Sequence, residues 1–150
     1  MKASKFPTHK ILFPIETTSR ELLYKLFLSI KLADNRHKCY IGSKREITNL
    51  FTKVSPFIYF DKGYHEKVSI DYLYKPITKA GGSIFSLDEE GGLDFKDFHT
   101  INRRYPQEIF KYFSCIFLWG KMQSEFLSQN RKEYKKYNFL ISGHPRFELL

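Results

Sequence analysis

Residues 10–33 read "KILFPIETTSRELLYKLFLSIKLA" and contain the change of pattern that decides the fold. The first six residues form a short apolar run with polar residues on both sides, which is typical of a buried strand. Thr18 and Glu21 then have capping-box spacing, which predicts a helix with Thr18 at its N-cap. Apolar residues follow at helical spacing, at Leu22, Leu23, Leu26, Phe27, Ile30 and Ala33. The stretch therefore predicts a strand followed by a helix of about four turns.

The same alternation of strand and helix continues to the end of the chain. Further apolar runs predict strands at residues 38–42, 56–61, 83–89, 115–120 and 139–143. Between and after them we expect helices at 43–51, at 66–82 with a break near Pro76, from Pro106, at 121–137 and from Pro145. The apolar runs lack period-two alternation, which indicates strands covered on both faces. We predict one α/β domain over residues 1–150, a Rossmann-like, doubly wound, mostly parallel six-stranded sheet with helices on both faces.

The composition limits the class of protein and the compartment. A net charge of +9 favours an anionic partner, although a lysine-rich composition without a functional meaning explains it equally well. Cys39 and Cys115 lie inside apolar runs and are expected to be buried and reduced, which suits the cytosol. The sequence has no apolar core of a signal peptide and no run long enough to span a bilayer. We expect a cytoplasmic protein, at most peripheral at the inner face of the cytoplasmic membrane.

Polar and charged residues follow each predicted strand. Ligands of open α/β sheets bind beyond the carboxyl ends of the strands, so these residues are expected to share one edge. They are Glu16, Arg20, Gly42, Ser43, Lys44, Asp61, Lys62, Asp88, Glu89, Glu90, Gly91, Trp119, Gly120, Gln123, Gly143, His144 and Arg146. The edge is therefore the predicted position of a ligand site.

Several established motifs are missing from the sequence. There is no glycine-rich dinucleotide fingerprint, no phosphate-binding P-loop, no zinc-ligand spacing and no nucleophile elbow. The histidines are far apart and give no metal-ligand spacing. We expect no metal and no cofactor, and nucleic-acid binding has no support beyond the net charge.

Six segments carry a resemblance to a known family. They are "FPIETTSREL" (13–22), "YIGSK" (40–44), "FDKG" (60–63), "LDEEGG" (87–92), "LWGKMQSEFL" (118–127) and "SGHPRFELL" (142–150). In this order they resemble bacterial surface-carbohydrate biosynthesis proteins that look like GT-B-type glycosyltransferases, distantly similar to CDP-glycerol glycerophosphotransferases. The chain departs from the family at His144, where an asparagine is usual, and near Thr17, where a basic residue is frequent.

The resemblance implies the acceptor-side half of a two-domain enzyme. Family members continue into a second Rossmann-like domain that binds most of the donor, whereas this sequence ends at Leu150. The implied partners are a nucleotide-sugar donor and a glycan or glycolipid acceptor, with a second domain or polypeptide docking near residues 147–150. The implied function is sugar transfer in surface polysaccharide synthesis, incomplete in this chain alone. The alternative is a Rossmann-like module that binds a glycan or a protein without catalysis.

Glycosyl transfer needs a base for the acceptor hydroxyl and cations for the leaving phosphate. Three consecutive acids, Asp88, Glu89 and Glu90, repel one another, so at least one is expected to have a raised pKa. In an extended segment Glu89 points away from Asp88 and Glu90. The candidate bases are therefore Glu89 or Glu90, with Glu16 as the competing residue.

Other residues are candidates for substrate binding. They are Arg20, Lys44, Asp88, Gly91 and Arg146. The cations Arg20, Lys44 and Arg146 suit a carboxylated or phosphorylated sugar, and Gly91 allows a ligand to approach the main chain closely. The candidate residues also have alternative structural roles. Asp88–Glu90 form an exposed loop whose acids pair with neighbouring lysines, and Glu16 caps the first helix with Thr18. Arg20 pairs with an acid on an adjacent loop, and Arg146 holds the chain as it crosses towards a second domain. The functional reading predicts that these residues converge at one edge of the sheet.

Overall fold

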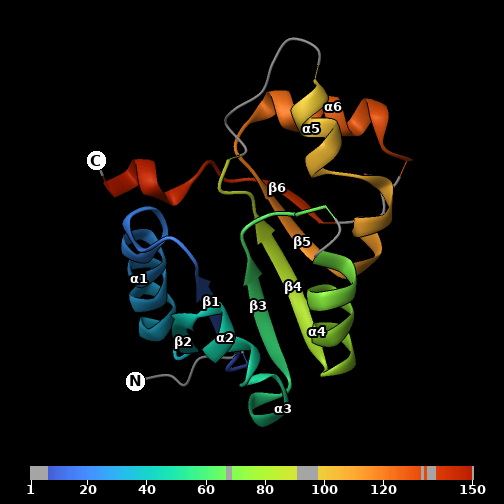
Figure 1. Cartoon of the computed structure of the whole chain (residues 1–150). Helices are drawn as coiled ribbons and strands as arrows, with labels where there is room; N and C mark the ends of the chain where they lie inside the picture. Colours follow the sequence, from blue (N-terminus) through green and yellow to red (C-terminus); the bar gives the residue numbers. More distant parts are fainter. Residues whose placement is uncertain (1–6, 67–68, 91–97, 133, 135–137, 150) are drawn as a thin grey trace.

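The protein folds around one six-stranded sheet in which every strand pair is parallel. The computed structural model describes residues 7–66, 69–90, 98–132, 134 and 138–149. The strand order is β2-β1-β3-β4-β5-β6 (Figure 1). The strands are β1 (Lys10–Ile15), β2 (Lys38–Ser43), β3 (Phe57–Asp61), β4 (Gly82–Leu87), β5 (Phe113–Leu118) and β6 (Phe139–Ile141). The predicted α/β, Rossmann-like fold is confirmed.

Helical segments connect the strands. They are α1 (Thr18–Asp34), α2 (Lys44–Thr48), α3 (Phe51–Val54), the π-helix η1 (Ile70–Tyr74), α4 (Lys75–Lys79), α5 (His99–Arg104), the 3₁₀-helix η2 (Gln107–Tyr112), α6 (Lys121–Asn130) and the 3₁₀-helix η4 (Pro145–Leu149). The predicted helix at 43–51 is two short helices, and the predicted helix at 121–137 ends at Asn130. The segment does not break at Pro76, because this proline lies in the first turn of α4, where no main-chain N–H is needed.

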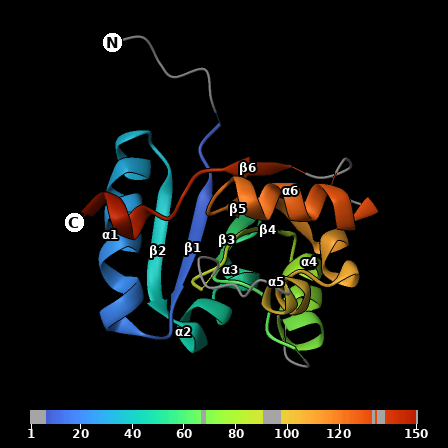
Figure 2. The same ribbon diagram turned by 90° about the horizontal axis from the view of Figure 1, so that it is seen from above.

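The strand order determines which face each helix covers. The step from β1 to β2 runs in one direction across the sheet, and the four later steps run in the other. Since crossovers between parallel strands are right-handed, α1 must lie on one face and α2 to α6 on the opposite face. Figure 2 shows this division, with strands between α1 and the helices α4, α5 and α6, while η4, which follows β6, lies beside α1. The two faces are therefore covered very unequally by the described helices.

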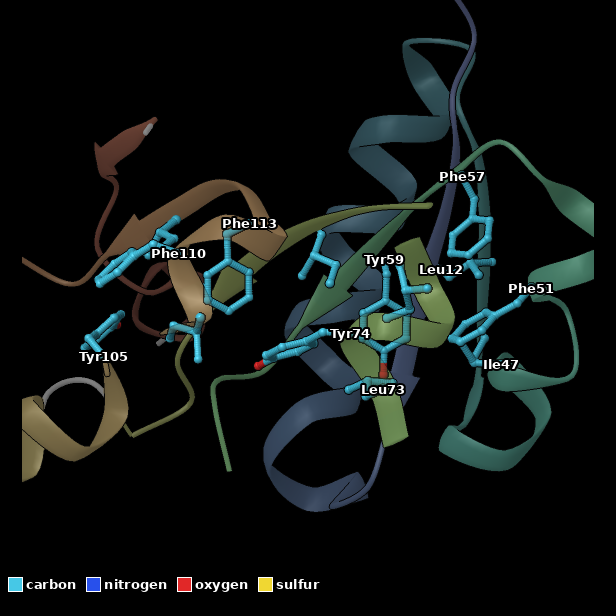
Figure 3. Packing of buried hydrophobic residues seen from close by; sticks show 14 of the residues in the cluster. Leu12, Ile47, Phe51, Phe57, Tyr59, Leu73, Tyr74, Tyr105, Phe110 and Phe113 are labelled. Carbon is cyan, nitrogen blue, oxygen red and sulfur yellow. The ribbon is translucent and has the colours of Figure 1, made fainter. Parts of the chain in front are cut away.

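Two apolar clusters fill the space on the two faces. The larger lies under α2 to α6 and includes Tyr59, Tyr74 and Phe113, which Figure 3 shows packed side by side. The smaller lies under α1 and is made of Ile11, Phe13, Tyr24, Phe60 and Leu87. Neighbouring residues of a strand thus point to different clusters, as the pleat of a strand requires.

Helix α1 presents a different face to the sheet from the one that apolar periodicity predicts. Its apolar stripe is exposed: Leu22, Leu23, Leu26, Phe27 and Ile30 are between 36% and 68% accessible. The residues buried against the sheet are Glu21, Tyr24, Lys25 and Ser29. The predicted helix is thus present, but its apolar spacing does not identify the face that is buried.

A buried ion pair accounts for this orientation. The Lys25 ammonium donates to the main-chain oxygen of Pro14 at 2.8 Å and to Glu21 Oε2 at 2.8 Å, and both side chains are fully buried. The Glu21 carboxylate accepts from the main-chain N–H groups of Glu16 and Thr17. Glu21 therefore satisfies donors at the helix start, where Thr17, not Thr18, is the N-cap and makes no side-chain capping bond. These bonds join the end of β1 to α1.

Removing the cation of this pair is expected to destabilise the fold strongly. Lys25→Met leaves the Glu21 carboxylate buried without its cation, and breaking a buried pair in this way costs about 3–5 kcal/mol. Urea denaturation followed by circular dichroism measures the loss. Lys31→Met, an exposed change on the same helix, is the control and is expected to alter stability by less than about 0.5 kcal/mol. A loss of similar size in both variants would refute the assignment.

Candidate functional site at the carboxyl edge of the sheet

The three acids that follow β4 lie buried or half-buried between arginines from distant segments. Asp88 and Glu90 share Arg104 of α5, whose Nη1 is 2.6 Å from Asp88 Oδ1 and whose Nη2 contacts Glu90. Glu90 also pairs with Arg20 of α1 at 3.3 Å. Glu89 pairs with a different arginine, Arg146 of η4, at 3.0 Å. Residues 89 and 90 form a turn and not the extended segment for which the alternation of side chains was predicted. The acids thus form one cluster with three arginines.

Glu89 is almost fully buried, at 4% exposed. It accepts a hydrogen bond from the Tyr24 hydroxyl and lies 3.6 Å from Nε2 of His144. His144 is buried and packs against the rings of Tyr24 and Trp119. Burial raises the pKa of Glu89, but the contacts with His144 and Tyr24 outweigh it and hold the pKa below its ordinary value. This direction is the opposite of the one expected for a base poised near neutral pH.

Asp88 has the contrasting environment. Burial raises its pKa above the ordinary value despite the opposing charge of Arg104, in line with the expectation for at least one of the three acids. Its Oδ2 is buried and has no hydrogen-bond partner among the described residues. Gly63 packs directly against it: φ at Gly63 is +117°, and a Cβ there would lie 3.0 Å from Asp88 Oδ1. A larger residue at 63 would therefore be strained and crowded.

Glu16 lies at the end of β1 between two lysines. Its carboxylate is 3.1 Å from the Lys44 ammonium and 2.7 Å from the Lys62 ammonium. Partial burial raises the pKa of Glu16, but the bonds from Lys62 and Lys44 outweigh it and keep the pKa below the ordinary value. Lys62 also lies 3.7 Å from Glu21, and its main-chain oxygen accepts from the N–H of Glu89. Lys62 thus connects this group to the acid–arginine cluster.

A small polar pocket lies beside Glu16. Its volume is about 250 Å³, and its lining includes Glu16, Lys44, Asp61, Lys62, His65 and Ser69. It lies between the ends of β1 and β3, where the direction of the strand order reverses. Such switch points are where open α/β sheets bind ligands. We call this the switch-point pocket.

Asp61 lines the switch-point pocket and was placed at the ligand edge by the sequence, but it was not among the predicted catalytic or substrate-binding residues. It is the last residue of β3 and is 2% exposed. Its Oδ2 accepts from the Tyr74 hydroxyl at 2.9 Å, from the Gly63 N–H at 3.2 Å and from the Ser86 hydroxyl at 3.4 Å. Burial raises the pKa of Asp61 to about 6, and the bonds from Tyr74 and Gly63 limit the rise. The signal in the sequence is an acid that ends a continuous apolar strand.

The structure divides the predicted site residues into two groups. Glu16 and Lys44 line the switch-point pocket. Arg20, Asp88, Glu89, Glu90 and Arg146 belong to the acid–arginine cluster. Gly91 lies outside the described residues. Arg104, which completes the cluster, was not among the predicted residues. It lies between the predicted strand at 83–89 and the predicted helix from Pro106, where the sequence predicts neither a helix nor a strand.

The described residues contain no group of three or more histidine, cysteine or acidic side chains placed to hold a metal ion. Cys39 and Cys115 are both free thiols. Among the described segments, no helix combines the length and the apolar character needed to cross a bilayer.

Comparison with known proteins finds no relative. The chain matches no protein-family model, no curated protein and no solved structure.

Loss of Arg104 is expected to destabilise the protein through Asp88. Arg104→Met removes the cation from a carboxylate that is 2% exposed, and we expect a loss of about 2–4 kcal/mol in chemical denaturation. The double variant Asp88→Asn, Arg104→Met removes the buried charge as well and is expected to recover more than half of the loss. Arg103→Met, whose pair with Glu66 is exposed, is the control with little effect. No recovery in the double variant would contradict the pairing.

Asp61 is expected to make stability depend on pH in a characteristic direction. Its pKa is raised from 3.8 to about 6 in the folded state, so the folded protein keeps a proton that the unfolded chain releases. Stability therefore falls as pH rises from about 4 to about 6, by about 3 kcal/mol in all, and is level above that range. The measurement is urea denaturation of the natural protein and Asp61→Asn at pH 3.5 to 8. The difference between them should follow this curve; a constant difference would refute the assignment.

Proposed function

We propose that this chain is the acceptor-binding half of a GT-B-type glycosyltransferase that works in the synthesis of bacterial surface polysaccharide. The proposal joins the six-segment resemblance to one structural observation: an aspartate with a pKa near 6 lines a small pocket at the switch point of the sheet. A carboxylate with a pKa near neutrality suits a base that takes the proton from an acceptor hydroxyl. We assign that role to Asp61, ahead of Glu89, Glu90 and Glu16.

The size of the switch-point pocket supports the acceptor side rather than the donor side. About 250 Å³ is below the usual range for drug-sized ligands, roughly 300–1,000 Å³, and suits one sugar ring. A nucleotide sugar is much larger, so its nucleotide would need another domain or polypeptide. Lys44 and Lys62 border the pocket and suit an acceptor that carries a carboxylate or phosphate. Such an acceptor would be a charged glycan or glycolipid, met in the cytoplasm or at the inner face of the membrane.

The acid–arginine cluster favours a second candidate function. Glu89 and Glu90 are held by arginines, and the lowered pKa of Glu89 does not suit a base. If the whole carboxyl edge is structural in this way, the protein is a module that binds a glycan without catalysis. The two candidates share the switch-point pocket and differ in what Asp61 does there.

Binding of small sugars to the isolated chain tests the shared part of the proposal. The probes are glucose, glucuronic acid, glucose 1-phosphate and glycerol 3-phosphate, each titrated against ¹⁵N-labelled protein in NMR experiments. We expect a charged probe to shift the amide signals of Gly63, His65 and Ser69. Lys44→Gln is expected to weaken binding about threefold to tenfold, since it removes one charged contact. Glu125→Gln, an exposed change on α6, is the matched control.

Two results would overturn the proposal. The first is that none of the four probes shifts these signals at up to about 50 mM, a concentration above the weak affinities expected of one sugar ring. The second is tight binding of a nucleotide sugar by this chain alone, which would place the donor here. Once a donor-binding partner is identified, Asp61→Asn separates catalysis from binding. If the chain is part of an enzyme, the variant loses at least about 100-fold in transfer rate and keeps its acceptor affinity. If the chain is a binding module, neither the natural protein nor the variant transfers a sugar.

A further inference from the structure

A large apolar groove lies on the face of the sheet that α1 covers in part. Its volume is about 1010 Å³, four times that of the switch-point pocket. Its floor is made of apolar side chains from four strands, and α1 forms one wall through Leu28 and Leu32. The floor residues are Ile11, Phe13, Ile58, Phe60, Phe85 and Phe117. Of these, Ile58, Phe85 and Phe117 remain partly accessible.

The groove is a consequence of the topology. Every crossover after β2 places its helix on the opposite face, so none of the described helices between β2 and β6 can cover β3, β4 and β5 on this side. All-parallel sheets are nearly always covered on both faces, because their strands expose apolar side chains to both sides. Figure 2 shows α1 near β2 and β1, at one end of the sheet. The described part of the chain thus leaves an apolar face that needs a covering element.

We propose that this groove binds an amphipathic α-helix from a partner polypeptide, with acidic residues beside the helix's apolar face. The floor is the face of a sheet, so it offers side chains and no free main-chain donors or acceptors. An occupant must therefore satisfy its own main-chain hydrogen bonds, which a helix does and an extended segment does not. Helices are also the usual cover of parallel sheets. The proposal is independent of glycosyl transfer.

The charge of the partner helix follows from the lining. Lys31 is an exposed cation of the lining, and Lys10 is a second lysine there, whose ammonium also donates to the main-chain oxygens of Val54 and Ser55. Among the described residues, the lining contains no aspartate or glutamate. Asp34 is near in sequence and exposed but is not part of the lining. His37 accepts a hydrogen bond from the N–H of His9 at Nδ1 and adds no acidic character. An apolar surface with lysines and no acids at its border favours a helix with an apolar face and acidic flanks.

Three synthetic peptides test the inference. The first is a fluorescent 15-residue peptide of leucine, alanine and glutamate with leucines at helical spacing. The second has the same composition in an order that breaks the spacing, and the third has lysine in place of glutamate. Fluorescence anisotropy measures binding to the whole chain, and NMR locates it through the signals of Ile58, Phe85 and Phe117. We expect the first peptide to bind in the groove at least about tenfold more tightly than the other two.

Two variants and a control locate the interaction on the protein. Lys31→Glu reverses an exposed charge of the lining and is expected to weaken the acidic peptide about fivefold and to strengthen the basic one. Phe117→Asp places a carboxylate in the floor and is expected to reduce binding at least about tenfold, with circular dichroism confirming that the variant is folded. Lys79→Glu, on α4 across the sheet, is the matched charge reversal and is expected to change nothing.

Four outcomes would overturn the proposal. One is equal binding of the first and second peptides, which would mean that the groove does not distinguish a helical spacing of leucines from another order. Another is binding that leaves the floor signals unchanged. A third is a response of these signals to dodecyl phosphate and not to the acidic peptide, which would make the groove a lipid site. The last is a dimer in sedimentation experiments that Phe117→Asp converts to a monomer, which would make the occupant a second copy of this chain.

Discussion

The structure depends on the neutralisation of three consecutive acids at the end of β4. Asp88 and Glu89 are almost fully buried, and a buried carboxylate is stable only where cations and hydrogen bonds compensate for lost water. The cations come from Arg20, Arg104 and Arg146, which lie on three different helical segments. One tripeptide therefore fixes α1, α5 and η4 against the centre of the sheet. A strongly basic chain concentrates acids here because its arginines converge here.

The buried pair of Glu21 and Lys25 has a comparable effect on α1. The pair bonds to the main chain at the end of β1, so the face of α1 that carries it must lie against the sheet. The apolar stripe of the same helix is then left on the outside. Local electrostatics thus overrides apolar periodicity. If α1 were rotated about its axis to bury the apolar stripe, Glu21 and Lys25 would lose their bonds to the main chain at the end of β1. The partly open face beside α1 is the other consequence of this placement and of the strand order.

Sequence patterns predict the sheet well and the site less well, for physical reasons. Continuous apolar runs identify all six strands, and the absence of period-two alternation identifies a parallel sheet. Apolar periodicity does not identify the buried face of α1, because it counts apolar residues and does not register that Lys25 has an acceptor at Pro14. Arg104 was missed because its partner, Asp88, lies 16 residues away, and the sequence predicts no helix or strand that would bring the two together. The environment of Asp61 depends on burial by neighbouring strands, which no local pattern encodes.

The carboxyl edge separates acids into two electrostatic classes. Glu16 and Glu89 have lowered pKa values because cations or hydrogen-bond donors face them, whereas burial raises the pKa values of Asp61 and Asp88. Glu16 and Asp61 line the same pocket, so one cavity contains an acid that stays ionised and another that gains or loses a proton near pH 6. Carboxyl groups whose environments drive their pKa values apart are typical of sites that move protons. Asp88 also has a raised pKa, but Arg104 pairs with it in the acid–arginine cluster. Asp61 lines the switch-point pocket instead, so it is the residue for which a structural role is the weaker explanation.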